Sequence, residues 1–473
     1  MATDRRRSHV LWSGFEAGAS AALSFVSAFV VARIVGPAEL GVGAASVALH
    51  VLLWVAVNAL FADAIVQRAA LDDDDASSAF WASALVGVGA GVLQAGAGVA
   101  LAASFGDPRM VAMAALLALP LPLVGAGGAV QGLLTRDRAY RVLAGRAVIG
   151  QGLGTATGIA AALLGAGAWA LVLQQAVTSS VGALALLLRS RWRPRLVLRW
   201  TRVRALLHTG LPLAASTVVQ QSRYRLFAVM IGATAGPAAL GMVHLAFRLS
   251  DTVRDLALTA LWRLMLPPLA ERQQDLPALQ ASVDRYAFLS GLALFPVIGA
   301  MLLVMRPLVR LALGPVWEPA AIAAAPLLLL MVWLFLGFPG GVASVARGGA
   351  RYAMVAQIVA TVATLAGVAL LRPATPLAAV GIWCGAQLLA SPYLVATTAR
   401  LLQAGWLRQQ RAGLPALGLA AAATAAALAL PPLAGPLPTW ALIAARLAVL
   451  GTVYLAGAAA LLRGRVRAVL AAA

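Results

Sequence analysis

Apolar runs long enough to cross a membrane recur along almost the whole chain. About 20 consecutive apolar residues in a helix span the hydrocarbon core of a bilayer. The runs are separated by short segments rich in glycine, proline or charge, as turns between antiparallel helices are. The pattern predicts an all-α polytopic membrane protein with about fourteen spans, near residues 10–33, 41–65, 78–104, 110–133, 142–164, 167–188, 206–231, 241–266, 286–305, 319–342, 352–371, 376–398, 414–431 and 439–462.

The most basic stretch lies between the sixth and seventh predicted spans. It reads RSRWRPRLVLRWTRVR, from Arg189 to Arg204, and holds seven arginines and no acidic residue. An arginine in hydrocarbon costs roughly 2.5–3.5 kcal/mol, so this stretch must lie in water beside lipid headgroups. We expect its arginines to bind anionic headgroups; the alternative that they also help to collect an anionic ligand stays open. The acidic run Asp72–Asp75 is expected to be a solvated turn.

The basic stretch also divides the chain. We expect an N-terminal helical bundle of about six spans at 1–188, a basic cytoplasmic linker at 189–205, and a C-terminal bundle of about six spans at 206–398. Two additional helices would follow at 399–473.

The composition agrees with a membrane protein. The 473 residues are 62% hydrophobic and 11% charged, with mean hydropathy +0.89, which excludes a soluble globular domain. All 36 basic residues are arginines, and the net charge is +20. Because the arginines are scattered among short loops, positive-inside topology explains them better than a nucleic-acid partner does.

Counting arginines by side predicts the orientation. With the N-terminus inside, twenty-six of the 36 arginines fall on the inner side and five on the outer side. This bias predicts a multi-pass protein with both termini in the cytoplasm and an even number of spans. The single cysteine, Cys384, excludes an intrachain disulfide.

A short repeat indicates an internal duplication. The turn GPAELG at residues 36–41 recurs as GPAALG at 236–241, and each copy follows the opening span of its half. Two copies on either side of a basic linker predict duplicated bundles, an architecture that alternating-access transporters use.

Several further motifs carry a resemblance to a known family. With GPAELG, they are GLL-x-R (Gly132–Arg136), GAGAWALVLQQ (Gly165–Gln175), RPRL (Arg193–Leu196), TGLPL (Thr209–Leu213), AFRLSD (Ala246–Asp251) and LGPVWEPA (Leu313–Ala320). The chain resembles the polysaccharide biosynthesis transporters, the O-antigen and exopolysaccharide flippases of the multidrug/oligosaccharidyl-lipid/polysaccharide exporter superfamily.

The resemblance implies both a fold and a function. The fold would be two pseudo-symmetric helical lobes around a central V-shaped cavity. The function would be alternating-access export of a polyprenyl-pyrophosphate-linked oligosaccharide for surface polysaccharide assembly. Partners would then be this lipid-linked oligosaccharide, membrane lipids and polysaccharide polymerase or assembly proteins, with no nucleic acid.

Charged residues inside the seventh and eighth spans are the candidate substrate site. His244, Arg248, Asp251 and Asp255 fall on one stripe about 60° wide on a helix, and Arg223 would lie at the depth of Arg248, roughly 10–12 Å below the outer surface. Such charges face protein or a water-filled cavity. We expect a substrate-binding cavity wall made of Gln220, Arg223, Arg225, His244 and Arg248. The alternative is that Arg248 pairs with Asp251 or Asp255 and locks the helix pair.

The acids of the spans are candidates for ion coupling or for salt bridges: Glu16, Asp63, Asp251 and Asp255. A lone carboxylate in the membrane can titrate and couple ion flow to transport. Glu16 lies near enough to the inner end of its helix to reach the cytoplasm instead. Asp63 is expected to pair with Arg68.

The sequence has no Walker A loop, metal-ligand cluster or nucleophile elbow. We therefore expect no catalytic residues, metal or cofactor, and no enzyme activity. Three alternatives stay open. An ion-coupled drug exporter of the same superfamily would need an acidic cavity, and a membrane glycosyltransferase would need a large external loop with catalytic residues. The third is a scaffold for polysaccharide assembly.

Overall fold

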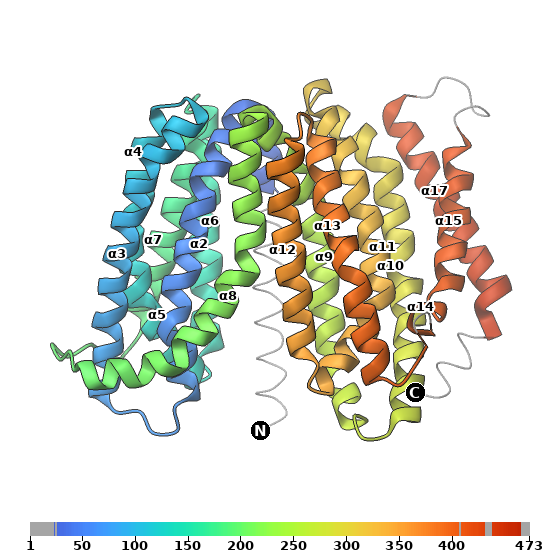
Figure 1. The fold of residues 1–473 in the computed structure, drawn as a ribbon. Coiled ribbons are helices and arrows are strands. Elements are labelled where there is room, and N and C mark those ends of the chain that lie inside the picture. The colour runs from blue at the N-terminus through green and yellow to red at the C-terminus, as the bar shows by residue number, and fades with distance from the viewer. Residues whose placement is uncertain (1–22, 24–25, 406–407, 431–437, 465–473) are drawn as a thin grey trace. The chain divides into compact units, whose positions relative to one another are not determined.

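The computed structural model describes residues 23, 26–405, 408–430 and 438–464 (Figure 1). Within these ranges every regular element is a helix. By proximity of its backbone the chain forms two compact units. Unit 1 comprises Met1–Leu245 and Leu371–Thr375, and unit 2 comprises Ala246–Leu370 and Pro376–Ala473.

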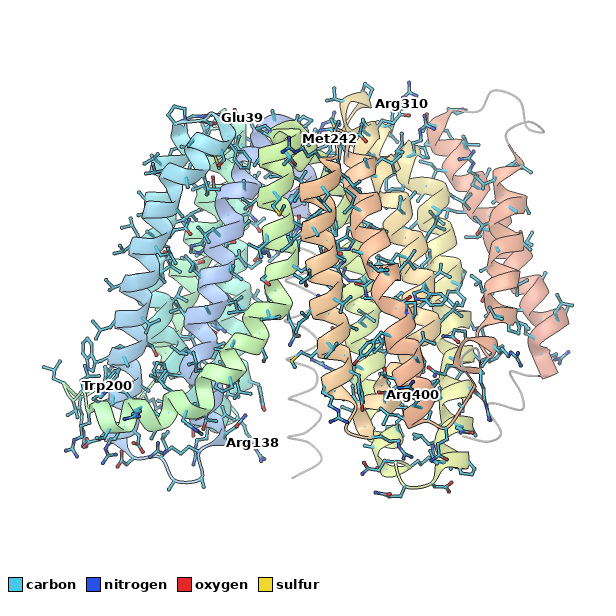
Figure 2. All side chains as sticks on the ribbon, viewed as in Figure 1. Glu39, Arg138, Trp200, Met242, Arg310 and Arg400 are labelled. Carbon is cyan, nitrogen blue, oxygen red and sulfur yellow. The ribbon has the colours of Figure 1, made fainter. Side chains whose placement is uncertain are left out.

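In unit 1, a short apolar helix at Val26–Val35 is followed by seven further helices and the start of the next. These are α2 (Pro37–Gln67), α3 (Asp73–Phe105), α4 (Arg109–Ala118), α5 (Pro120–Arg136), α6 (Tyr140–Leu163), α7 (Trp169–Arg189) and α8 (Trp200–Ala235). Helix α6 packs against α7, α2 against α8 and α5, and α3 against α5 and α4. Glu39 lies at one end of the unit, and Arg138 and Trp200 lie at the other (Figure 2).

Unit 2 holds most of α9 and the remaining helices. They are α9 (Pro237–Glu271), α10 (Leu276–Ala312), η1 (Pro315–Trp317), α11 (Glu318–Ala346), α12 (Ala350–Leu371), α13 (Pro376–Leu401), α14 (Arg408–Arg411), α15 (Leu414–Leu428), α17 (Thr439–Gly457) and the π-helical η2 (Ala458–Leu462). Helix α10 packs against α11, α15 and α17, and α11 packs against α13.

The helices confirm the prediction of an all-α polytopic membrane protein. Nine of the described helical segments are long and apolar enough to cross a bilayer. Every predicted span from 41–65 onward coincides with a helix, whereas most of the first span, 10–33, lies outside the described residues. Helices α6, α8 and α9 are as long as these nine membrane-length segments but are more polar, and the apolar helix α15 is shorter than they are. Fourteen spans are compatible with this arrangement.

Unit 1 extends beyond the predicted start of the second bundle because α8 packs on α2. Val203, Leu206 and Ala214 of α8 join the apolar core that contains Leu60 and Ala64 of α2. Figure 1 shows the first part of α8 lying across the end of unit 1 before the helix turns alongside α2. Pro212 lies inside α8, where a missing N–H and a bulky ring bend a helix. The bundle ranges 1–188 and 206–398 stay a prediction.

The two copies of the repeated turn meet within unit 1. A Cβ on Gly41 would overlap the carbonyl oxygen of Pro237, and a Cβ on Gly241 would overlap the carbonyl oxygen of Pro37. The start of α2 and the start of α9 therefore touch through their backbones. Glycine is required at the last position of both copies for this close approach.

A buried histidine closes a gap in the backbone hydrogen bonding of unit 1. Helix α4 ends at Ala118 and α5 begins at Pro120, so carbonyls in the last turn of α4 lose their usual donors. His50 is fully buried, with Nδ1 2.8 Å from the Leu117 carbonyl and Nε2 3.0 Å from the Ser179 hydroxyl. Since a carbonyl only accepts, Nδ1 donates to Leu117, and Nε2 of a neutral ring accepts from Ser179.

The contact between α2 and α8 predicts a strong effect of one methyl group. A Cβ on Gly210 would overlap the carbonyl oxygen of Leu60. We expect Gly210→Ala to destabilise the protein by about 1–3 kcal/mol because the helices must move apart. Gly96→Ala is the control, since a Cβ there meets nothing within 4 Å; this variant should be about 0.4–1 kcal/mol more stable. The thermal unfolding midpoint in detergent measures both, and equal midpoints would contradict the packing.

Candidate functional site

The end of α8 and the start of α9 bring three polar side chains together within unit 1. The Tyr224 hydroxyl lies 2.9 Å from Nδ1 of His244, and their rings are 6.4 Å apart between centroids. The Arg225 guanidinium carbon lies 5.3 Å from the centre of the Tyr224 ring, within the range of a cation–π contact. This Arg225–Tyr224–His244 row joins two of the predicted site residues through a tyrosine that sequence reasoning missed. The contact between Tyr224 and His244 becomes visible only in the structure, because the two residues lie on different helices.

Arg223 is almost fully buried beside this row. Only 3% of its surface is exposed, in a helix otherwise made largely of apolar residues. A guanidinium in hydrocarbon costs roughly 2.5–3.5 kcal/mol, so a buried arginine must be compensated by groups around it. Gln220, by contrast, is exposed on α8.

In unit 2, Asp251 and Asp255 of α9 pair with Arg254 and not with Arg248, the partner that the alternative interpretation named. Arg254 Nη1 lies 2.7 Å from Asp251, and Arg254 Nη2 lies 3.0 Å from Asp255. No side chain in the described part of the chain forms an ion pair with Arg248, which is partly exposed. The alternative in which Arg248 is held by Asp251 or Asp255 therefore has no support in the described residues.

The two acids expected in the first half are placed as follows. Glu16 lies outside the described residues. Asp63 is exposed on α2, and its expected partner Arg68 contacts Asp75 instead, at 3.4 Å. Among the residues that the structure describes, no group of three His, Cys, Asp or Glu side chains is arranged to hold a metal ion.

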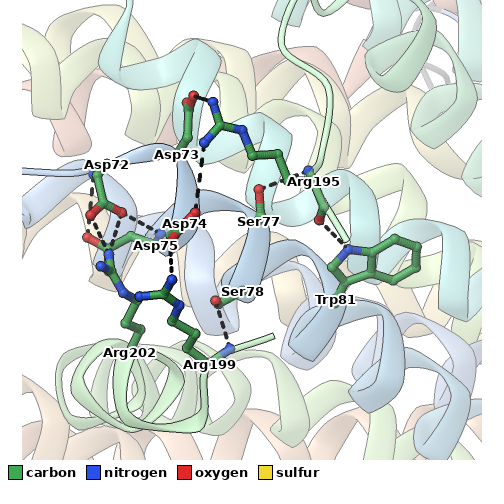
Figure 3. Close-up of polar contacts among 10 residues, drawn as sticks. All are labelled: Asp72, Asp73, Asp74, Asp75, Ser77, Ser78, Trp81, Arg195, Arg199 and Arg202. Atoms are coloured by element: carbon green, nitrogen blue, oxygen red, sulfur yellow. Dashed lines mark hydrogen bonds and ion pairs between the residues drawn. The ribbon is translucent and has the colours of Figure 1, made fainter. Parts of the chain in front are cut away.

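The acidic run Asp72–Asp75 was expected to be a solvated turn, and the structure shows this to be wrong (Figure 3). It forms the start of α3 and pairs with arginines of the basic stretch. Arg195 lies 3.2 Å from Asp73, Arg199 lies 3.0 Å from Asp74, and Arg202 contacts both Asp72 and Asp75. We call this set of ion pairs the acid–arginine clamp. Three of the seven arginines expected at lipid headgroups are thus neutralised within the protein.

Asp75 is the centre of the clamp. Its side chain is 4% exposed and lies 3.1 Å from Arg202 and 3.4 Å from Arg68. Asp72 and Asp75 also form a capping box, in which each carboxylate accepts from the backbone N–H of the other. The hydrogen bond from Arg202 holds the pKa of the Asp72 carboxyl below its ordinary value, so the pair is ionised at neutral pH.

Polar side chains of α3 hold the backbone of the same stretch. Ser77 Oγ accepts from the Arg195 N–H at 3.1 Å, and Ser78 Oγ accepts from the Arg199 N–H at 3.1 Å. The Trp81 indole donates to the Arg195 carbonyl at 2.9 Å. These bonds satisfy irregular backbone at the end of a membrane-spanning helix, where unpaired groups are costly.

The arginine of the GLL-x-R motif is structural. Arg136 donates to the carbonyls of Ile65 at 3.2 Å and Ala69 at 2.8 Å, and also to that of Arg68. These carbonyls end α2, where four acceptors lack intrahelical partners. The guanidinium therefore caps α2, and the motif joins α5 to α2.

The acid of the GPAELG turn has a matching role at the opposite end of unit 1. Glu39 accepts two hydrogen bonds from Arg109, at 3.1 and 2.7 Å, and one from the Ala168 N–H at 2.8 Å. Arg109 also binds Asp107 and lowers the pKa of that carboxyl. Helices α2, α4 and α7 are tied together here, and Ala239 in the second copy of the turn has no such carboxylate.

Comparisons with known proteins show the family of this chain and proteins with a similar fold. The family described as "Polysaccharide biosynthesis protein" matches residues 30–322. The succinoglycan biosynthesis transport protein ExoT of Rhizobium meliloti (strain 1021) is 25% identical over 317 residues, which are 66% of this chain and 63% of that protein. The match thus spans less than two thirds of the relative's length.

Solved transporters share the fold. The structure titled lipid II flippase MurJ, inward closed conformation, aligns with a TM-score of 0.77 at 10% identity, over 97% of this chain and 100% of that one. An inward-facing multidrug resistance transporter of the MATE family aligns with a TM-score of 0.62 at 17% identity, over 81% and 95% of the two chains. At these identities the likeness is one of fold.

The clamp predicts a sharp difference between two neighbouring acids. Asp75→Ala removes a buried carboxylate shared by two arginines and should cost about 1–3 kcal/mol of stability. Asp73→Ala is the matched control, because that side chain is 56% exposed and pairs only at the surface, and it should cost less than about 1 kcal/mol. Thermal unfolding of the purified variants measures both. If Asp73→Ala were the more damaging change, the clamp would not be centred on Asp75.

Proposed function

Because this chain belongs to the polysaccharide biosynthesis protein family, we propose that it exports a lipid-linked oligosaccharide for surface polysaccharide assembly. The substrate would be an oligosaccharide on a polyprenyl pyrophosphate, carried across the bacterial inner membrane by alternating access. Both termini would lie in the cytoplasm, as the arginine distribution favours. The names of the relative and of the fold neighbours, a succinoglycan transport protein and a lipid II flippase, support this choice of substrate class.

The observation that carries the proposal is the row of Arg225, Tyr224 and His244 beside the buried Arg223. A guanidinium offers paired N–H donors that match phosphate oxygens, so arginines suit a pyrophosphate. An aromatic ring beside them suits the apolar face of a sugar. The same few residues therefore offer contacts for both parts of a pyrophosphate-linked sugar.

Arg248 of α9 is a further residue proposed to bind the substrate. Its partly exposed guanidinium contrasts with Arg254, whose charge is balanced by Asp251 and Asp255. A cation at membrane depth without an acidic partner in the described residues is available to an anionic ligand. Gln220, exposed on α8, would add a hydrogen-bonding group to the same cavity wall.

An ion gradient or the downstream use of the product would drive export. Such coupling would use carboxylates of the membrane helices. Asp63, Asp251 and Asp255 are the candidates among the described residues, and Glu16 is a further candidate outside them. Lipids of the membrane and proteins that polymerise or assemble the polysaccharide would be its partners. The reaction needs no catalytic residue or cofactor from this chain, because translocation breaks no covalent bond.

A drug exporter of the same superfamily is the second candidate, favoured by the MATE fold neighbour. A site for organic cations needs uncompensated carboxylates, whereas here Asp251 and Asp255 both pair with Arg254, and further arginines lie in the α8–α9 hairpin. A glycosyltransferase would need a large catalytic loop, whereas segments such as 106–108 and 372–375 join the helices by a few residues. A scaffold for polysaccharide assembly would need neither Arg223 nor Arg248 for its function.

The proposal predicts that two single arginines are essential for export. Arg223→Ala and Arg248→Ala should each abolish polymer export in a deletion strain, because each removes a cation offered to the pyrophosphate. Polymer on the cell surface is the measurement, with immunoblots and gel filtration to check the amount and folding of the protein.

Arg310→Ala is the matched control. Arg310 is exposed in the last turn of α10, at the end of unit 2 opposite Arg400 (Figure 2), and should tolerate the change. Normal export by both Arg223→Ala and Arg248→Ala would rule out the proposed cavity wall.

A further inference from the structure

Three large apolar side chains are exposed within the basic stretch. Leu196 is 89% exposed, Leu198 is 50% exposed and Trp200 is 69% exposed. We call these three residues the linker wedge. They lie close together in sequence, among arginines, at a point where the chain leaves one bundle of membrane helices. Contiguous exposed apolar side chains mark an interaction site.

The surrounding bonds fix the direction in which the wedge points. The side chains of Arg195 and Arg199 turn toward Asp73 and Asp74 in the acid–arginine clamp. Leu196, Leu198 and Trp200 alternate with these arginines and lie exposed. The backbone between them is held to α3 by Ser77 and Ser78. These ion pairs and hydrogen bonds hold the backbone in a conformation in which the three apolar side chains are exposed.

The wedge lies at the level where a membrane helix begins. Ser77 and Ser78, which hold its backbone, come directly before the apolar part of α3. Trp200 lies at the same end of unit 1 as Arg138, in the turn between α5 and α6 (Figure 2). Tryptophan is typical of this boundary between hydrocarbon and water.

The exposed face of the first part of α8 also carries apolar and basic side chains. Val203, Leu206 and Gly210 are buried against unit 1, whereas Arg204 and Leu211 are exposed. The exposed face thus combines apolar side chains with a cation that forms no ion pair among the described residues, and Arg191 is similar. Helices of this kind lie in the headgroup region of an anionic bilayer, with the apolar side chains inserted.

We propose that the linker wedge anchors the basic stretch to the membrane by inserting Leu196, Leu198 and Trp200 into the interface of an anionic bilayer. Arg191 and Arg204 contact headgroup phosphates beside it. The clamp neutralises Arg195, Arg199 and Arg202, so apolar insertion rather than the full charge of the stretch holds it at the membrane. A lipid surface suits the wedge better than a protein does, because both the depth and the neighbouring cations match headgroups.

Fluorescence of a labelled full-length chain in nanodiscs tests this proposal. Cys384→Ala supplies a background without cysteine, and Leu196→Cys or Leu198→Cys carries an environment-sensitive dye. Asp137→Cys is the matched control, an exposed polar position in the α5–α6 turn next to Arg138. The nanodiscs contain an anionic phospholipid, with or without a nitroxide on the acyl chain just below the headgroup.

The expected result is a blue-shifted dye at 196 and 198 that loses about half of its emission with the nitroxide lipid, while the dye at 137 keeps its emission. Dye emission at 196 and 198 as in water, with no quenching, overturns the proposal. A blue shift without quenching also overturns it, since that outcome means a protein partner or a second copy covers the wedge. If the quenching in nanodiscs of zwitterionic lipid equals that in nanodiscs of anionic lipid, the result contradicts the proposal that Arg191 and Arg204 bind anionic headgroups.

Discussion

Polar groups in a bilayer must find partners inside the protein or at the headgroups, and this constraint organises the whole chain. At several ends of helices in unit 1, a side chain from another part of the chain supplies the missing partner. Arg136 caps α2, His50 caps the end of α4, and the acid–arginine clamp fixes the start of α3. The apolar helices can therefore pack closely, as at Gly210, because their polar ends are satisfied.

The same constraint separates structural arginines from candidate functional ones. Arg109, Arg202 and Arg254 are balanced by carboxylates and hold helices or turns in place. Arg248 lies in α9, where a charge is costly to maintain, and it forms no ion pair among the described residues. Binding an anionic substrate, such as the proposed lipid-linked oligosaccharide, would account for an arginine at this position.

Much of the fold could be predicted because apolar run length is a local property of the sequence. The spans near 78–104 and 376–398 coincide with α3 and α13 for this reason. The turn at Gly36–Gly41 and its copy at Gly236–Gly241 could also be recognised in the sequence, but the contact between the two turns could not be predicted from it.

Contacts between distant residues could not be read in the same way. The charge of Asp72–Asp75 suggested solvent, yet its partners lie more than a hundred residues later in the chain. The helical stripe offered Arg248 as a possible partner of Asp251 or Asp255, whereas Asp251 forms its ion pair with Arg254 at i,i+3 spacing. Tyr224 gave no signal, because a tyrosine in an apolar helix is ordinary until its neighbour on the next helix is known.

The central claim is that the chain moves a polyprenyl-pyrophosphate-linked oligosaccharide, and the contents of a deletion strain test it most directly. Mass spectrometry of lipid extracts from that strain measures the polyprenyl-linked intermediates and identifies their glycan. The account predicts that one complete lipid-linked oligosaccharide accumulates and disappears again when the wild-type gene is restored. A strain that loses surface polysaccharide without accumulating any lipid-linked intermediate would contradict it.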